Sequence, residues 1–183
     1  MRLYLDRIPS PVGTMLLVSD DAAVRALDFA DYEARLHRLL QTHYGAVDLH
    51  ERREQLGVRE RLAAYFGGDF AAFDGLALAT NGSPFQKAVW AALCAIPPGT
   101  TATYGALARG LGLPSGARAV GLANGANPIS LIVPCHRVIG ADGTLTGYAG
   151  GLHRKHWLLR HEGVRVPAQR TASQTAFDFA ARR

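Results

Sequence analysis

The chain has 183 residues, enough for one compact domain or for two small domains that share an interface. Hydrophobic residues make up 48% of it and charged residues 19%, which excludes a disordered chain. Two cysteines exclude a disulfide framework, and no group of cysteines and histidines has zinc-ligand spacing, so we expect a cytoplasmic protein without metal or cofactor. Residues 1–77 carry nine basic and twelve acidic residues (net −3), whereas residues 78–183 carry eleven basic and three acidic ones (net +8). A basic half fits a polyanion such as nucleic acid, although a solvated basic face without a partner has the same composition.

The chain begins with Met1 to Asp6, where charge comes early and no apolar leader core is present. Apolar runs elsewhere are far too short to span a membrane, so we expect neither export nor membrane insertion. Residues 2–8, 13–19 and 23–29 are rich in apolar residues and are separated by turn-forming segments. They predict a small antiparallel sheet.

Two helices are expected after this sheet. Asp31 stands where it can cap a helix whose apolar residues recur at helical spacing up to Tyr44. Val58 begins a second apolar face, which a Gly-Gly pair ends. The first half is therefore predicted to be α+β, with its histidines on the surface or in packing. Residues 67–82, rich in glycine, alanine and aspartate, are expected to link it to the second half.

The second half opens with a clear helix start. Ser83 is a capping serine, Pro84 takes the first helical position and Gln86 the third, which together form a capping box. Thr103 and Ser115 are placed to cap two shorter helices that a glycine turn joins. This pair of short helices predicts a helix-turn-helix.

The second of these short helices, residues 117–123, consists mainly of alanine and glycine, and Arg118 is its one charged residue. Such a surface can approach a nucleic-acid backbone closely while the guanidinium projects from it. Small residues are also typical of tight helix packing, so the composition leaves both interpretations open.

Cys135 is the strongest candidate for chemistry. The apolar run of residues 129–133 predicts a short buried strand that Pro134 ends, because proline cannot donate to a sheet ladder. His136 and Arg137 follow the cysteine, and a nearby cation lowers the pKa of a thiol and so raises the fraction of thiolate, its nucleophilic form. The alternative is a buried packing cysteine, which the flanking proline, histidine and arginine make less favourable.

Several motifs resemble one family, the O6-alkylguanine-DNA alkyltransferases, or methylated-DNA–protein-cysteine methyltransferases, in their bacterial constitutive form. The motifs are Gly116-Ala117-Arg118-Ala119-Val120-Gly121, Asn127-Pro128, Ile132-Val133-Pro134-Cys135-His136-Arg137-Val138, Gly147-Tyr148-Ala149-Gly150-Gly151 and Trp157-Leu158-Leu159-Arg160-His161-Glu162-Gly163. The resemblance runs from about Ser83 to Gly163, and the Pro-Cys-His-Arg signature is highly specific.

The resemblance implies an α+β fold with two domains. Residues 1–77 would form a ribonuclease-H-like domain with a small antiparallel sheet and helices. Residues 78–164 would form a mainly helical DNA-binding and alkyl-acceptor domain with a winged helix-turn-helix. Residues 165–183 depart from the resemblance, and from their polar and basic composition we expect a tail that is partly disordered or lightly docked.

The resemblance also implies the reaction, which is repair of DNA by direct reversal. Cys135 would accept the alkyl group from O6 of a damaged guanine and keep it, because a thioether is a poor leaving group. Glu162 would orient His136, which would deprotonate Cys135 through a bridging water. Asn127 would brace the turn that leads to the cysteine.

Four further residues would form the base pocket. Tyr104 would donate a proton or a hydrogen bond to the guanine ring as negative charge builds there. The carbonyls of Cys135 and Val138 would read the exocyclic amine of the base. Tyr148 belongs to the same loop as Ala149, whose backbone N–H would meet O6.

The implied partner is double-stranded DNA that contains O6-alkylguanine or O4-alkylthymine. Because the alkylated atom is out of reach inside the stack, the nucleotide must rotate out, and Arg118 would fill the space it leaves. Thr103, Ala117 and Gly121 would lie against the DNA in the minor groove. The resemblance implies a monomer with no membrane partner.

Three other functions fit parts of the sequence. A non-catalytic binder of alkylated DNA that recruits other repair factors would carry tryptophan in place of Cys135. A DNA-binding regulator would explain the charge and the helix pair, but not the Pro-Cys-His run. A cysteine hydrolase would use Cys135 and His136, yet it would turn over and would not need a basic half.

Overall fold

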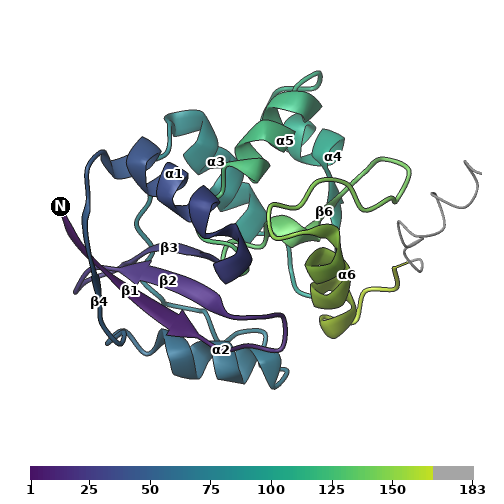
Figure 1. Cartoon of the computed structure of the whole chain (residues 1–183). Coiled ribbons are helices and arrows are strands. Elements are labelled where there is room, and N and C mark those ends of the chain that lie inside the picture. The colour runs from purple at the N-terminus through teal and green to yellow at the C-terminus, as the bar shows by residue number, and fades with distance from the viewer. Residues whose placement is uncertain (167–183) are drawn as a thin grey trace, which may run out of the picture.

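The computed structural model describes residues 1–166 as a four-stranded sheet with a helix on one face and the rest of the protein on the other (Figure 1). The strands are β1 (Arg2–Ile8), β2 (Met15–Ser19), β3 (Val24–Phe29) and β4 (Asp48–Glu51), in the order β3-β2-β1-β4. The predicted antiparallel strands are confirmed for β1, β2 and β3. The sheet is nevertheless mixed, because β4 pairs parallel to β1. Its short and mostly polar sequence gave no strand signal.

Alternation along the strands divides the core into two layers. Leu16 and Val18 of β2 lie in one apolar cluster with Leu36 and Leu40 of helix α1 (Glu33–Tyr44). The intervening Leu17 faces the other layer, where helix α2 (Val58–Phe66) packs together with the second half of the chain. The sheet therefore serves as the base on which the second half rests.

The capping prediction for Asp31 is wrong. A short 3-10 helix, η1 (Ala30–Tyr32), precedes α1, and the N-cap Tyr32 receives no side-chain hydrogen bond. Asp31 instead accepts a hydrogen bond of 2.9 Å from Nη1 of Arg154, far along the chain. A carboxylate that looked like a local cap is thus used for contact between the halves.

The second half is mainly helical, as predicted. Its elements are α3 (Pro84–Cys94), β5 (Ala102–Thr103), α4 (Tyr104–Gly110), α5 (Ala117–Gly125), the 3-10 helix η2 (Cys135–Arg137), β6 (Val138–Ile139) and α6 (Leu152–His161). The capping box of Ser83 and the cap of Thr103 are both present. The cap predicted for Ser115 is wrong, because Gly116 takes the N-cap position of α5 without a side-chain hydrogen bond.

The strand predicted for residues 129–133 is also wrong. The segment is a sequence of turns in which Leu131 has a φ of 73°, and only Ile129 forms a bridge, to Leu27 of β3. The amide of Leu27 donates to the carbonyl of Pro128 at 2.9 Å, and its carbonyl accepts from Ser130 at 2.8 Å. The segment is apolar because it is buried between the halves of the chain.

Two arginines also fasten the halves together. Arg154 of α6 donates to the carbonyls of Val12 at 2.7 Å and Gly150 at 2.9 Å, and its guanidinium carbon lies 4.3 Å from the ring centroid of Phe29. Arg35 of α1 is the second, and it donates to the carbonyl of Asn127.

No helix among residues 1–166 is long and apolar enough to cross a membrane. Most of the predicted basic tail, residues 167–183, lies outside the described residues.

Gly150 is a direct test of this packing. A Cβ added there would lie 2.3 Å from Cε2 of Phe29 and 2.8 Å from Cε1 of Tyr148, so Gly150→Ala overpacks the junction. We expect the free energy of unfolding in urea to fall by about 1–3 kcal/mol. Gly110→Ala is the control, because nothing lies within 4 Å of its added Cβ, and it should leave stability equal or higher. Equal stability of both variants would contradict this packing.

Candidate active site

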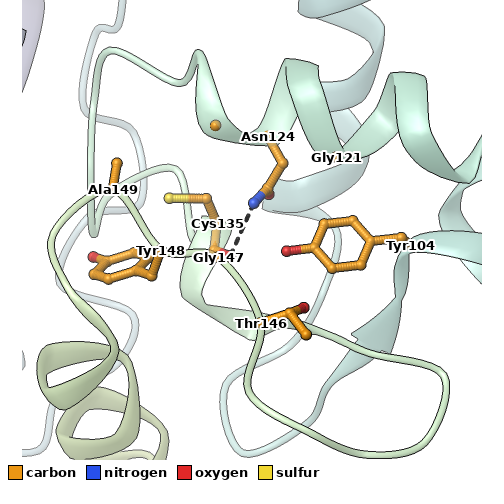
Figure 2. Close-up of a pocket in the computed structure, with 9 residues that line it drawn as sticks. Tyr104, Gly121, Asn124, Cys135, Thr146, Gly147, Tyr148 and Ala149 are labelled. Atoms are coloured by element: carbon orange, nitrogen blue, oxygen red, sulfur yellow. Dashed lines mark hydrogen bonds between the residues drawn. The ribbon is translucent and has the colours of Figure 1, made fainter. Parts of the chain in front are cut away.

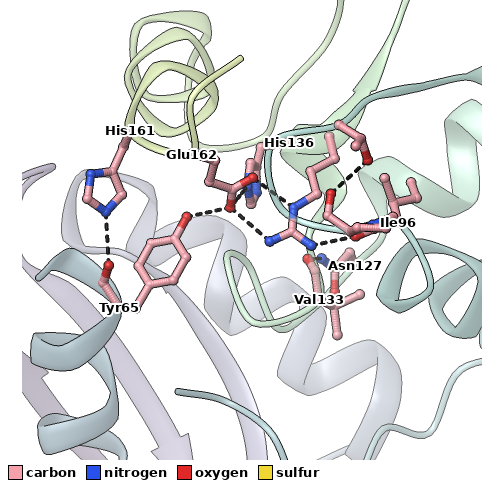
Figure 3. Close-up of polar contacts among 10 residues, drawn as sticks. Tyr65, Ile96, Asn127, Val133, His136, His161 and Glu162 are labelled. Atoms are coloured by element: carbon pink, nitrogen blue, oxygen red, sulfur yellow. Dashed lines mark hydrogen bonds and ion pairs between the residues drawn. The ribbon is translucent and has the colours of Figure 1, made fainter. Parts of the chain in front are cut away.

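The carboxylate of Glu162 is the centre of the site, directly after α6 (Figure 3). It is buried, and Arg137 donates to both of its oxygens, from Nε to Oε2 and from Nη2 to Oε1, each at 2.9 Å. Nε2 of His136 lies 3.0 Å from Oε1, and the hydroxyl of Tyr65 donates to the same oxygen at 2.7 Å. Burial raises the pKa of Glu162, but these hydrogen bonds outweigh it and hold the pKa well below its ordinary value. The group is therefore a carboxylate at neutral pH.

His136 is fully buried, and the adjacent carboxylate determines its tautomer. An ionised carboxylate only accepts hydrogen bonds, so Nε2 carries the hydrogen and Nδ1 keeps its lone pair. Burial lowers the pKa of His136 despite the opposing effect of Glu162, which favours the neutral ring. Among the described residues no protein group bonds to Nδ1. His136 thus has the form of a base that can accept a proton.

Cys135 begins the 3-10 helix η2 and is almost entirely buried. Burial raises the pKa of its thiol, and a hydrogen bond with Asn127 and the charges of Arg35 and Lys155 offset only part of the effect. The expectation that neighbouring cations hold the pKa of this thiol below its ordinary value is wrong, because burial outweighs them. The neighbouring Arg137 is itself engaged with Glu162. The resting thiol is therefore protonated and depends on a base for activation.

Asn127 holds the turn that presents the thiol. Its Nδ2 donates to the carbonyl of Val133 at 2.9 Å, and its Oδ1 accepts from the amide of Ile129 at 3.0 Å. Arg35 binds the start of the same turn, since Nη2 donates to the carbonyls of Gly125 at 2.8 Å and Asn127 at 3.0 Å. The first half of the chain thereby takes part in positioning the cysteine.

Cys135 forms part of the wall of a cavity of about 460 Å³ (Figure 2). Tyr104 and Tyr148 flank the cysteine on opposite sides of this view. The lining residues are Tyr104, Gly121, Asn124, Gly125, Cys135, Thr146, Gly147, Tyr148 and Ala149. Burial raises the pKa of Tyr104, so its phenol stays protonated and can donate. The predicted pocket residues Tyr104, Tyr148 and Ala149 are thus brought to the thiol.

Sequence reasoning missed Lys155, which binds the backbone of Thr146 in the wall of this cavity. It is fully buried in α6, and its Nζ donates to the carbonyls of Val138 and Thr146, each at 2.6 Å. Burial lowers its pKa to about 8. Val138, whose carbonyl was predicted to read the base, is not among the residues that line the cavity, and its carbonyl accepts from Lys155. Lys155 precedes two buried leucines at helical spacing, a signal that could have placed it on the inner face.

The residues predicted to face DNA lie beside this cavity. Ala117, Arg118 and Gly121 of α5 line a second, apolar hollow of about 480 Å³ that shares Tyr104 with the first. Arg118 is exposed, whereas Val120 and Ala123 are buried on the opposite face of α5. The Thr103 hydroxyl accepts from the amide of Ala106 at 3.1 Å and so serves as a cap.

The described part of the chain holds no group of three or more histidine, cysteine or acidic residues that could bind a metal ion. The other cysteine of the chain, Cys94, is exposed on α3.

Comparison with known proteins gives consistent matches. Residues 84–164 match the family model described as 6-O-methylguanine DNA methyltransferase, DNA binding domain. A methylated-DNA–protein-cysteine methyltransferase of Salmonella typhimurium is 51% identical over 170 residues, which cover 89% of this chain and 97% of that protein. The crystal structure of a Mycobacterium tuberculosis O6-methylguanine methyltransferase is 40% identical and aligns with a TM-score of 0.76, covering 96% of this chain and 99% of that one. The M. tuberculosis OGT in complex with DNA aligns equally well, with a TM-score of 0.76 and 40% identity over 97% of this chain and all (100%) of that one.

The buried carboxylate predicts a pH-dependent loss of stability in Glu162→Gln. Removing it leaves Arg137 buried without its counter-ion, so we expect the free energy of unfolding at neutral pH to fall by about 3–5 kcal/mol. Because the folded pKa of Glu162 lies below the unfolded value of 4.5, wild type loses this contribution as the pH falls below 4.5, and the gap to the variant should shrink there.

Glu33→Gln is the matched control, since Glu33 pairs with Arg7 at a partly exposed position. It should cost less than about 1 kcal/mol. Chemical denaturation at several pH values measures both variants. A Glu162→Gln gap that is small, or that does not change with pH, would contradict the charged network.

Proposed function

The chain belongs to the family of methylated-DNA–protein-cysteine methyltransferases, and from this premise we propose that Cys135 is its alkyl acceptor. The protein is an O6-methylguanine DNA methyltransferase that repairs alkylated DNA. One observation carries the assignment of the acceptor. A buried thiol forms the wall of a cavity of about 460 Å³ and is followed in the chain by a histidine that is hydrogen-bonded to a buried carboxylate.

Activation of the thiol follows from the charges at the site. Cys135 is protonated at rest, and Nδ1 of His136 accepts its proton through a bridging water. Glu162 stabilises the resulting imidazolium while remaining ionised itself. Confining the proton transfer to this buried site produces the thiolate only next to the substrate.

Transfer is a displacement at the methyl carbon. The Cys135 sulfur forms a bond to this carbon as the bond from carbon to O6 breaks, and the electron pair of that bond moves into the guanine ring. The phenol of Tyr104 donates to the ring and offsets the developing negative charge. The products are a thioether and guanine, whose ring takes up one proton, and this balances the proton that His136 accepted from Cys135. Since a thioether is a poor leaving group, each protein molecule acts once.

The cavity recognises the base through backbone groups. The carbonyls of Cys135 and Val138 accept from the exocyclic amine of guanine, and the amide of Ala149 donates to O6. Tyr148 forms the side of the same cavity. O4-alkylthymine is smaller and presents its alkyl group on a similar exocyclic oxygen, so we include it among the substrates.

The DNA substrate is a duplex, entered from the minor groove. α5 presents Ala117 and Gly121 to the backbone, Thr103 lies at the start of α4, and Arg118 occupies the space left by the rotated nucleotide. The net charge of +8 over residues 78–183 supports contacts to phosphate. In this proposal the protein is a monomer in which residues 1–77 form a supporting domain and residues 78–164 form the DNA-binding domain. It acts in the cytoplasm, where bacterial DNA lies.

A non-catalytic binder of alkylated DNA that recruits other repair factors is the alternative, and one experiment separates the two. The protein is mixed with a duplex oligonucleotide that contains O6-methylguanine, and its intact and peptide masses are measured. We expect one methyl group per protein, located on Cys135. Tight binding without a gain in mass would favour the alternative.

The two cysteines provide matched variants for this experiment. Cys135→Ala should gain no methyl group yet bind the duplex with an affinity near that of wild type. Cys94→Ser removes the exposed cysteine of α3 and should gain one methyl group at the wild-type rate. Methylation of Cys135→Ala would remove Cys135 from its role.

The proposed role of Arg118 predicts a difference between substrates. Arg118→Ala should slow repair of duplex DNA by about tenfold or more, because nothing then replaces the rotated base in the stack. Its reaction with free O6-methylguanine base should be nearly unchanged. Arg38→Ala removes an exposed arginine from α1 and should leave both rates unchanged. Equal losses on duplex and free base would show that Arg118 has another role.

A further inference from the structure

Tyr65 brings a side chain from the first half of the chain to the carboxylate of the site. It lies in α2, 97 positions before Glu162, and its hydroxyl donates to Oε1 at 2.7 Å (Figure 3). The family resemblance assigned no role to this residue. Its contact therefore raises the question of what a tyrosine from the other half of the chain does to the proton acceptor.

The ring of Tyr65 is held in place on all sides. It is buried and stacks on Phe73 with the ring centroids 5.2 Å apart, while Phe70 and His161 pack against it edge-on. The backbone carbonyl of Tyr65 also lies 2.9 Å from Nε2 of His161. Tyr65 thus binds His161, the last residue of α6, and Glu162, the residue that follows it. Its hydroxyl therefore has a fixed direction.

The hydroxyl acts only as a donor. Burial, followed by the negative charge of Glu162, raises the pKa of Tyr65 far above its ordinary value, so the phenol keeps its proton at every pH at which the protein works. Oε1 of Glu162 accepts from Tyr65, from Nε2 of His136 and from Nη2 of Arg137. These donors compete for the electron density of one oxygen.

We propose that Tyr65 is a positioning residue that acts through Glu162 to keep His136 neutral and ready to take the proton of Cys135. A donor to a carboxylate draws charge from it and weakens its attraction for a neighbouring cation, here the imidazolium. Without the Tyr65 hydroxyl, Glu162 would bind that imidazolium more strongly, and His136 would keep a proton to higher pH. The proposal rests on the role of His136 as the base.

The other charged and titratable groups around the imidazole stay in place in Tyr65→Phe. Arg137 and Cys135 belong to η2, and Lys155 and His161 belong to α6. Tyr148 packs edge-on against the imidazole, with the ring centroids 6.4 Å apart. Arg137 and Lys155 lower the pKa of His136 by their positive charge, after the larger effect of burial. His161 contacts the backbone carbonyl of residue 65, which phenylalanine retains. A change in the pH profile is then attributable to the missing hydroxyl.

The test is the pH dependence of methyl transfer to Cys135 by Tyr65→Phe, measured as the single-turnover rate constant on a duplex with O6-methylguanine. We expect the midpoint of the acidic limb to rise by about half a unit to one unit, with a rate near that of wild type above it. Tyr44→Phe is the control. Its hydroxyl donates to the carbonyl of Ala79 at 2.7 Å, away from Glu162, and its midpoint should equal that of wild type.

A second variant retains the hydroxyl. Site-specific 3-fluorotyrosine at position 65 makes the phenol a stronger donor, and we expect the midpoint to move below that of wild type. Midpoints equal to that of wild type in both variants, or a rate lowered by the same factor at every pH, would overturn the role of Tyr65. Failure of the proposed function looks different, because wild type would then gain no methyl group on Cys135 at any pH.

Discussion

A buried negative charge at Glu162 determines how the site is built. Taking a carboxylate out of water is costly unless hydrogen bonds and an opposite charge compensate it. Arg137 supplies the opposite, positive charge, and His136 and Tyr65 supply further hydrogen bonds to the carboxylate. These partners come from η2 and α2, so the same interaction that keeps the carboxylate ionised also fixes the tautomer of the histidine and joins the two halves of the chain.

The first half of the chain supplies no residue to the wall of the cavity at Cys135, yet it positions the parts that do. β3 forms hydrogen bonds with the turn that follows Asn127, and Arg35 binds the carbonyl of Asn127 itself. Tyr65 reaches the carboxylate from α2. The sheet is therefore a rigid support for a strained turn, in which Leu131 has a positive φ. The thiol at the start of η2 is therefore positioned by the turn that precedes this short helix.

Local sequence signals predicted much of this fold correctly. The capping box of Ser83, the cap of Thr103, the apolar residues of β1 to β3 and the short helices α4 and α5 all depend on neighbours in the chain, and they appear as expected. Predictions failed where distant contacts decide the outcome. Residues 129–133 were predicted as a strand because they are apolar, but their burial comes from the junction between the halves. Nothing in the local sequence predicts the two carbonyl partners of Lys155, because they belong to other segments. The predicted direction of the Cys135 pKa was wrong for a related reason, because the burial that raises it and the pairing of Arg137 with Glu162 both depend on distant parts of the chain.

The central claim is that the ionised carboxylate holds His136 neutral, with its hydrogen on Nε2 and a free lone pair on Nδ1. Nitrogen NMR of the labelled imidazole at about pH 7 reads the protonation of each ring nitrogen directly. The account predicts a protonated Nε2 and an unprotonated Nδ1 in the wild-type protein before it meets DNA. A ring protonated at Nδ1, whether as the other tautomer or as the imidazolium, would contradict it.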